Sequence, residues 1–532
     1  MLLYAIIFIS GAAILALELL ASRIMTPYFG VSLYIWTGIL SITLVSLALG
    51  YWLGGRLAAS RASSPARLLG LYALMPALSA IAIVAACLVY PHAFAPLAAA
   101  SLVSGAFAAC FVLLFVPLVA ASAMNPLLVA VLLNRGTSGR AADAGAGKVF
   151  FVSTIGSVAG VIVTAFGLIP YVSNFAAVLI VALVLALLTL AAALFAHEPL
   201  ARKGLLVASA MGGCVLAATL LWRADSYTGR QGPFASAGAE WRVEASYNSL
   251  FGTVKVLRSP PDGSAPFWRM YFQDGLTQNT ADSSNRSTSF YTYGLEGLAR
   301  AYQPRMRTAL VLGLGAGMVP MALAKAGVRT EVVDIDPAAR RVAQGFFGFD
   351  PVAVRTHEAD ARTFARECRS RYDVIVVDLF HGDGTPDYLI TREFFRDLRA
   401  CLAPGGVAVF NTFADLTRPG AYAHFLVTLR VELPHLALYR PQGYGTHVNS
   451  LVVAAAQPLP APATVTFDYV PPRFAEVLWT MFSAPVPLAP SLFAGGRVIS
   501  DAVNPAAYDL AQMQMVYRRS VVQNAPAAML IN

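Results

Sequence analysis

The feature that most constrains this chain is a change in its pattern of hydrophobic residues near Trp222. Before that residue the sequence consists of long apolar runs, and beyond Arg230 apolar and polar segments alternate as in a water-soluble domain. A run of about 20 apolar residues is long enough to cross a bilayer as a helix. The sequence therefore predicts a membrane domain over residues 1–223. Its seven expected helices lie at residues 2–22, 33–55, 68–90, 97–120, 150–170, 175–196 and 204–222.

Composition favours the same class of protein. Hydrophobic residues make up 57% of the 532 residues and charged residues only 13%, which is too apolar for an ordinary soluble protein. The net charge of +9 includes no dense run of Lys and Arg. Nucleic acid is therefore not an expected partner, whereas membrane lipids are. The five cysteines include no CxxC pair, which predicts neither a disulfide framework nor a metal site.

Two kinds of residue stand out in the apolar half. The pairs Gly50/Gly54 and Gly156/Gly160 place small residues on one helix face, a spacing that favours close helix packing in lipid. Glu18 lies within the first expected span, with Arg23 after it. An ionisable residue in a span is a candidate for function. The alternative is structural pairing, with each other or with another helix.

The soluble half divides by its patterning. Residues 241–300 are β-rich and carry turn residues between short apolar runs, as expected for a small hairpin domain. In residues 301–532 strands and helices alternate, which predicts a parallel, doubly wound, Rossmann-like α/β sheet. In such sheets ligands bind at the carboxyl ends of the strands, and polar residues follow several of those ends.

A glycine-rich turn follows the first of these strands. Gly313, Gly315 and Gly317 come directly after the apolar run 309–312, and Asp334 ends the next strand about 20 residues later. Glycines let a backbone pass close to a ligand with its amides directed at it. A carboxylate at this distance accepts hydrogen bonds from ribose hydroxyls. The pattern fits either a dinucleotide or S-adenosylmethionine, and the alternative is a tight turn without a ligand.

Two later strand ends also carry acids. Asp360 and Ala361 follow the third strand, where a carboxylate can hold an adenine amino group. Asp360 is also well suited to cap the helix that follows, and the two roles are compatible. Asp378 ends the fourth strand in YDVIVVD. Together these acids favour S-adenosylmethionine or a relative of it as the ligand.

The order of these motifs resembles the spermidine synthase family of aminopropyltransferases, in its membrane-fused bacterial branch. The resemblance covers residues 241–415 and includes Asp274-Gly-x-x-Gln278, the glycine turn, Asp334-Ile-Asp336, Asp360-Ala361 and Asp378. It implies the fold of class I S-adenosylmethionine-dependent transferases. It also implies that an amine attacks the aminopropyl carbon of decarboxylated S-adenosylmethionine, and that methylthioadenosine leaves.

The resemblance assigns roles to single residues. Asp378 accepts the proton of the attacking amine, since a protonated amine cannot attack. His381 and Asp383 stand beside it, and His381 is either a general base or a loop residue facing water. Asp334 holds the ribose and Asp360 the adenine. The remaining expected donor-binding residues are Asn248, Gln278, Gly313, Gly315, Gly317, Asp336 and Ala361, and those of the acceptor pocket are Asp274, Tyr291 and Tyr293.

The chain also departs from the family pattern. Ala316 stands where the family has an acid before the last glycine, and His381 stands where it has a second acid after the catalytic one. The segment Phe290–Tyr293 lacks the family's carboxylate. An unpaired buried ammonium is costly, so these departures argue against putrescine as the acceptor. They leave a small amine or a membrane lipid as acceptor, and both S-adenosylmethionine and its decarboxylated form as donor.

Two other functions remain open on the sequence alone. One is methyl transfer or cleavage of S-adenosylmethionine on the same scaffold, and the other is a transporter or sensor gated by a nucleoside. We expect a multi-pass protein of a bacterial inner membrane, with a homodimer as a further expectation. The positive-inside rule with seven spans places the soluble domain outside, whereas a cytoplasmic cosubstrate favours the inside.

Overall fold

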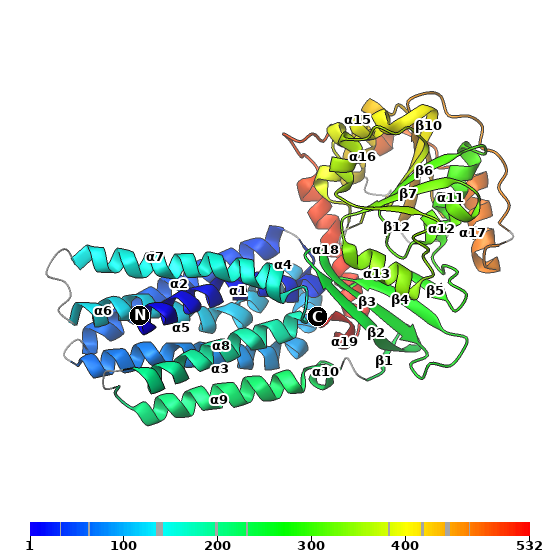
Figure 1. Ribbon diagram of the computed structural model, residues 1–532. Helices are drawn as coiled ribbons and strands as arrows, with labels where there is room; N and C mark the ends of the chain where they lie inside the picture. Colours follow the sequence, from blue (N-terminus) through cyan, green and yellow to red (C-terminus); the bar gives the residue numbers. More distant parts are fainter. Residues whose placement is uncertain are drawn as a thin grey trace. The chain divides into compact units, whose positions relative to one another are not determined.

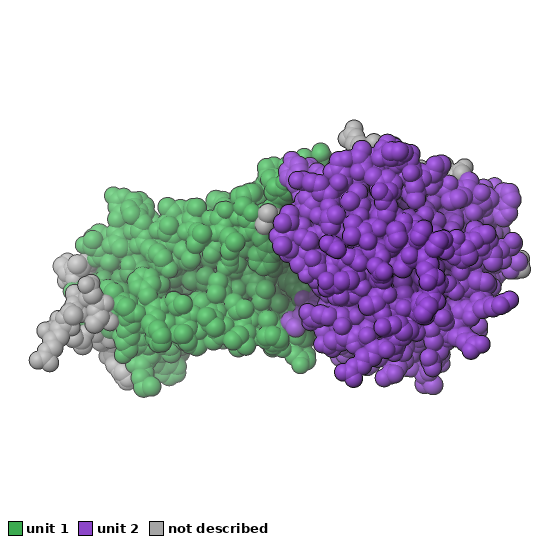
Figure 2. Space-filling model, turned by 90° about the horizontal axis from the view of Figure 1, so that it is seen from above, with its two compact units in different colours: residues 1–237, 518–532 green, residues 238–517 purple. Residues whose placement is uncertain are grey.

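The computed structural model forms two compact units (Figure 2). Unit 1 comprises residues 1–237 and 518–532, and unit 2 comprises residues 238–517. The expected division of the soluble half into separate domains at residue 300 stays a prediction. The residues that the structure describes are 1–31, 33–61, 64–134, 142–196, 200–229, 232–380, 384–415, 420–441, 447–467 and 469–532.

Unit 1 is helical (Figure 1). Within the described residues, seven helical stretches are long and apolar enough to cross a membrane, which confirms the number expected from the sequence. The fourth and fifth stretches each contain a short π-helical segment, η1 (Phe111–Phe115) and η2 (Val163–Leu168). The helices are α1 (Leu2–Phe29), α2 (Leu33–Arg61), α3 (Pro65–Ala100), α4 (Leu102–Cys110), α5 (Val116–Ser122), α6 (Met124–Asn134), α7 (Ala142–Ile162), α8 (Asn174–Phe195), α9 (Lys203–Trp222), α10 (Ala224–Tyr227) and the C-terminal α19 (Ala527–Leu530).

The glycine pairs lie at close helix contacts, as their spacing predicts. A side chain on Gly156 or Gly160 of α7 would meet the backbone of α1 at Phe8 or Ala12, and one on Gly50 or Gly54 of α2 would meet residues 119–126 of α5 and α6. Glu18 of α1 is buried inside unit 1. Its pairing with Arg23 stays a prediction.

Two sheets follow the helical region, as the patterning predicts. The smaller sheet has five strands in sequence order, of which β2 to β5 belong to unit 2, and its β2–β3, β3–β4 and β4–β5 pairs are antiparallel. This is the β-rich region expected after residue 241. The strands are β1 (Phe234–Ser236), β2 (Ala239–Ser249), β3 (Gly252–Ser259), β4 (Trp268–Gln273) and β5 (Leu276–Asp282).

The larger sheet has seven strands in the order β11-β12-β10-β9-β6-β7-β8. Its five strands from β10 to β8 are parallel, and β12 and β11 continue it antiparallel. The chain order reverses direction between β6 and β9, which is where doubly wound folds bind ligands. The strands are β6 (Thr308–Leu312), β7 (Arg329–Asp334), β8 (Arg355–Glu358), β9 (Tyr372–Val377), β10 (Leu402–Asp415), β11 (His435–Tyr439) and β12 (His447–Ala455).

Both faces of the larger sheet are covered by helices (Figure 1). Successive side chains of a strand point to opposite faces, so Leu310 and Leu312 of β6 pack in one core while Ala309 and Val311 pack in the other. The first core includes residues of α14 (Ala361–Arg366), α15 (Arg392–Cys401) and α16 (Gly420–Glu432). The second includes residues of α11 (Phe290–Tyr302), α12 (Met318–Lys325), α13 (Pro337–Phe346) and α17 (Pro472–Ser483).

Short elements complete unit 2. The 3-10 turns η3 (Asp387–Leu389) and η4 (Pro490–Phe493) flank the first core. The helix α18 (Ala507–Asn524) contributes its residues up to Tyr517 to this unit. Cys368 and Cys401 are joined by a disulfide. The sequence predicts no disulfide framework, and it does not indicate this single pair. The two residues are 33 positions apart and come together only when α14 packs beside α15.

Candidate active site

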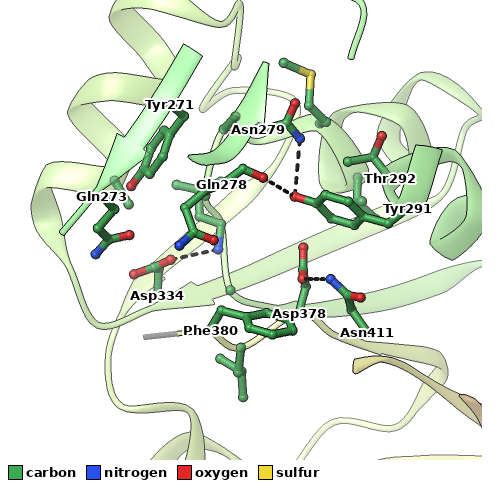
Figure 3. Close-up of a pocket in the computed structure, with 18 of the residues that line it drawn as sticks. Tyr271, Gln273, Gln278, Asn279, Tyr291, Thr292, Asp334, Asp378, Phe380 and Asn411 are labelled. Atoms are coloured by element: carbon green, nitrogen blue, oxygen red, sulfur yellow. Dashed lines mark hydrogen bonds between the residues drawn. The ribbon is translucent and has the colours of Figure 1, made fainter. Parts of the chain in front are cut away.

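A cavity of about 700 Å³ opens at the carboxyl ends of the parallel strands. Its wall combines the turn after β6, the end of β7, the residues after β8 and β9, the strand β5, and the start of α11. The size is that of a pocket for a nucleoside-sized ligand. Figure 3 shows the polar side chains that point into it.

The glycine turn leads from β6 into α12 along one side of the cavity. Gly313 has a φ of 96°, and a side chain there would collide with the carbonyl oxygen of Asp378. Gly315 has a φ of 49° and open space on the side where a Cβ would stand. Both line the cavity, whereas Gly317 is the N-cap of α12 and lies outside the described lining. The turn thus leaves room for a ligand beside Gly315.

Asp334 joins this turn to the end of β7. Its Oδ2 accepts from the backbone N–H of Leu314 over 2.7 Å, and its Oδ1 from that of Asp336 over 2.8 Å. Burial raises the pKa of Asp334, and these amide hydrogen bonds oppose the rise. Asp336 caps α13 by accepting from Ala338 N–H over 2.9 Å, and burial raises its pKa to about 6. Both carboxylates line the cavity.

Asp360 and Ala361 border the cavity at the start of α14. Asp360 accepts from the backbone N–H of Thr363 over 2.8 Å, so the expected capping role is confirmed. Its other oxygen, Oδ2, accepts from the Tyr388 hydroxyl over 3.0 Å. Its binding of adenine stays a prediction.

Asp378 stands on the cavity floor directly after β9. Its Oδ1 accepts from the Nδ2 of Asn411 over 2.8 Å (Figure 3). Burial raises the pKa of Asp378 to about 6 and the neighbouring Asp334 adds to the rise, while the hydrogen bond from Asn411 opposes it. A carboxyl with a pKa near neutrality is suited to exchange protons with a bound molecule.

Gln278 and Tyr291 also line the cavity, and a hydrogen bond joins them. The Tyr291 hydroxyl donates to the backbone carbonyl of Gln278 over 2.9 Å and accepts from the Nδ2 of Asn279 over 3.4 Å. Burial and the charge of Asp378 raise the pKa of Tyr291, so this hydroxyl keeps its proton. Tyr291 thereby joins the middle of β5 to the start of α11.

Other predicted site residues do not reach the described lining. Asp274 accepts from the backbone N–H of Thr253 over 2.9 Å, between the β4–β5 turn and β3. Asn248 of β2 accepts from the Thr253 hydroxyl, and Tyr293 donates to the carbonyl of Ser287 within the core. His381 and Asp383 lie outside the described residues. Roles in binding or catalysis for these residues stay predictions.

The cavity also contains residues that sequence reasoning missed. Asn411 lies near the end of β10 and Asn449 near the start of β12. A polar residue late in an apolar strand was the available signal for Asn411, because ligands bind at strand ends. The aromatic part of the described lining comes from distant segments: Phe251, Tyr271, Phe290, Tyr291, Phe380, Tyr388, Phe413, Phe474 and Tyr517.

The charged side chains of the described lining are all acidic. Its four ionisable carboxyl groups are Asp334, Asp336, Asp360 and Asp378, and it has no Lys, Arg or His among the residues described. The formal charge of this lining is therefore −4 when all four are ionised. Such a cavity favours a cationic ligand and disfavours an anionic group. Within the described residues no three His, Cys, Asp or Glu side chains come together as a metal site requires.

Several known proteins are similar in sequence or fold to the part of the chain that forms the cavity. The family model described as a spermine/spermidine synthase domain matches residues 288–417. A polyamine aminopropyltransferase of Vibrio vulnificus is 36% identical over 119 residues, which are 21% of this chain and 40% of that protein. An N-terminal histidine N-methyltransferase of Emericella nidulans is 33% identical over 174 residues, 31% of each chain. A solved structure of a probable spermidine synthase from Corynebacterium glutamicum is 19% identical with a TM-score of 0.40, over 49% of this chain and 97% of that one.

The matched segment coincides with much of the cavity. Residues 288–417 contain the glycine turn and all four carboxylates of the lining. The chain covers less than two thirds of the length of both curated relatives, 40% and 31%. The match is thus to a domain, and the apolar helices of unit 1 lie outside it. Residues 288–417 match the spermine/spermidine synthase domain, so this part of the chain is similar to the spermidine synthase family.

Proposed function

We propose that this protein is an integral-membrane transferase that moves an aminopropyl group from decarboxylated S-adenosylmethionine to an amine. The acceptor is a small amine or the amino headgroup of a membrane lipid. The observation that carries the proposal is the all-acid lining of the cavity, with Asp378 at its floor. The family match and its aminopropyltransferase relative support the reaction class.

The charge of the lining favours the decarboxylated donor. S-adenosylmethionine carries an α-carboxylate, which needs a cation or several N–H donors to replace its water. The described lining supplies no Lys, Arg or His for it. Decarboxylated S-adenosylmethionine carries only a sulfonium and an ammonium, and both are attracted by the carboxylates. The sulfonium nucleoside without a carboxylate is therefore the better fit.

We assign the donor to one half of the cavity. The donor half comprises the glycine turn, Asp334 and the residues around Asp360, where the ribose and the adenine would lie. Gly315 leaves space for the approach of a ligand, and the backbone amides of Leu314 and Asp336 fix the carboxylate of Asp334. The acceptor half comprises Asp378, Asn411, Tyr291 and the rings of Phe380 and Phe413.

Aminopropyl transfer needs one bond to form, one to break and one proton to be accepted, and the groups named above account for each. The nitrogen lone pair of the acceptor attacks the methylene carbon next to sulfur, and a C–N bond forms as the C–S bond breaks. The bonding electrons stay on sulfur, so the sulfonium becomes the neutral thioether of methylthioadenosine. The acceptor nitrogen gives up a proton to Asp378. A carboxylate at this place holds the amine deprotonated for attack.

The direct test uses the detergent-solubilised full chain. It is incubated with decarboxylated S-adenosylmethionine and, separately, with putrescine, a long-chain alkylamine or vesicles containing phosphatidylethanolamine. Mass spectrometry then follows methylthioadenosine and the aminopropylated product. We expect both products to form in equal amounts with at least one acceptor. If none of the acceptors gives methylthioadenosine or an aminopropylated product, the proposal is contradicted.

Methyl transfer is the second candidate. Ala316 lacks the acid that the family places near the donor's terminal amine, and one relative is a histidine N-methyltransferase. A methyltransferase converts S-adenosylmethionine to S-adenosylhomocysteine. Formation of S-adenosylhomocysteine, without methylthioadenosine, would favour this second candidate over aminopropyl transfer.

A further inference from the structure

Asp378 is held by a chain of two side-chain amides. The Nδ2 of Asn411 donates to Asp378 Oδ1 over 2.8 Å, and the Nδ2 of Asn449 donates to Asn411 Oδ1 over 2.9 Å. Both asparagines line the cavity, and Asn411 is 5% exposed. We propose that Asn411 and Asn449 are positioning residues that present an N–H donor to Asp378 and so direct the acceptor's proton to its other oxygen.

The sheet brings the three side chains together. Asn411 follows Phe410 of β10, which pairs with Val377 of β9 immediately before Asp378. Asn449 of β12 pairs with Phe413 of β10, two residues after Asn411. The three groups therefore stand on adjacent strands at one edge of the cavity. Their spacing is set by strand registers, so it is part of the fold.

Only one orientation of the Asn411 amide satisfies both contacts. A carboxamide has a donor end, Nδ2, and an acceptor end, Oδ1. Because Asn449 donates to the Oδ1, the Nδ2 of Asn411 is the end that faces Asp378. Without Asn449, the Oδ1 of Asn411 loses this donor, and the amide is held only at its Nδ2 end, by Asp378. Asn449 thus acts on Asp378 through Asn411.

The orientation has a chemical consequence for Asp378. A hydrogen bond donated to a carboxylate stabilises its charged form, and the bond from Asn411 opposes the effect of burial on the pKa of Asp378. Asp378 Oδ1 is occupied by this bond, while Figure 3 shows the second oxygen directed away from Asn411 and toward the ring of Tyr291. That second oxygen is the one available to an amine.

The inference rests on the proposed function, in which Asp378 accepts the amine's proton. Its test compares pH profiles of methylthioadenosine release for the full chain and for Asn411→Leu. Loss of one donor to the carboxylate is expected to move the acid limb of the profile upward by about one pH unit. The rate then falls about tenfold well below pH 6 and about twofold at pH 7. Asn449→Leu is expected to shift the limb in the same direction by less.

A matched control separates positioning from strand stability. Thr412, next to Asn411 on β10, points to the opposite face and donates to the carbonyl of Ser450 over 2.6 Å. Thr412→Val removes a buried hydrogen bond from the same strand without touching Asp378. We expect it to lower thermal stability and leave the acid limb in place. An acid limb that moves equally in Thr412→Val would overturn the inference.

Infrared difference spectroscopy gives a readout that needs no turnover. The protonated-carboxyl band of Asp378, identified by its absence in Asp378→Asn, is titrated in the wild type and in both asparagine variants. An unmoved titration midpoint in Asn411→Leu contradicts the inference even if transfer is active. If Asn411→Leu does not fold, Asn449→Leu decides by the same criterion. If no acceptor is ever aminopropylated, the proposed function fails while this titration still tests the amide chain.

Discussion

In the donor half of the cavity, Asp334 accepts two backbone N–H groups and Asp360 caps α14. In the acceptor half, Asp378 accepts its hydrogen bond from a side chain, that of Asn411. The donor-half carboxylates therefore shape the backbone around the ligand as well as facing it. Among the described residues, the Asp378 side chain caps no helix and accepts from no backbone N–H, so its replacement tests chemistry with little effect on structure.

Asp378→Asn is expected to have the largest effect, because it removes the group that takes the proton. We expect turnover to fall by about 10³-fold, while affinity for decarboxylated S-adenosylmethionine changes by less than about threefold. Release of methylthioadenosine and calorimetric titration with the donor measure the two quantities. Equal losses of affinity and rate would show that the two halves do not differ as described.

Asp334→Asn is expected to lower donor affinity more than turnover, the opposite of Asp378→Asn. The variant loses an acceptor for ribose and for the amides of Leu314 and Asp336, so donor affinity falls by about 10- to 100-fold. Thermal stability falls too, because a backbone N–H is left without its partner. Calorimetry and thermal unfolding check both effects. Unchanged affinity in a folded variant would remove Asp334 from the donor site.

The rate should follow the ionisation of Asp378. Because burial raises its pKa to about 6 and the carboxylate is the active form, the rate is expected to fall about tenfold per pH unit below pH 6. Above that value the rate levels off. The pH profile of the wild type measures this, with Asp378→Asn as the reference that should lack the limb. A profile that is flat from pH 5 to 8 would exclude Asp378 as the base.

Asp336→Asn tests how much stability the folded chain loses by burying the carboxylate that caps α13. The pKa of Asp336 rises from 3.8 to about 6 on burial, so the folded state loses stability as the pH rises from about 4 to 6. Asn caps a helix about as well as Asp. The variant is therefore expected to be more stable than wild type by about 2 kcal/mol at pH 8, with little difference at pH 4. Thermal unfolding at both pH values measures it, and a variant destabilised at pH 8 would contradict the burial argument.

Much of the fold could be predicted from local patterns. Apolar runs indicated the seven membrane-length helical stretches among the described residues of unit 1, and alternating strands and helices indicated the parallel sheet of unit 2. The acids at the strand ends, Asp334, Asp360 and Asp378, were predictable because parallel strands present their carboxyl ends at one edge. These features depend on hydrophobicity and on order along the chain.

The site features that the sequence did not predict depend on contacts between distant segments. The Asn411–Asn449 pair requires the register of β10 with β12, across 38 residues, and Tyr517 reaches the cavity from α18. Asp274 was expected in the acceptor pocket; its carboxylate accepts from Thr253 N–H, it lies outside the described lining, and its role in binding stays a prediction. Short motifs do not show whether an acid serves a ligand or its own backbone.

Calorimetric titration of the wild-type chain with the two donors tests the central claim most directly. A cavity whose described lining has four carboxylates and no basic side chain should bind decarboxylated S-adenosylmethionine at least about tenfold more tightly than S-adenosylmethionine, since an unpaired buried carboxylate is costly. Equal or tighter binding of S-adenosylmethionine would contradict the claim that the acids of this cavity select the donor.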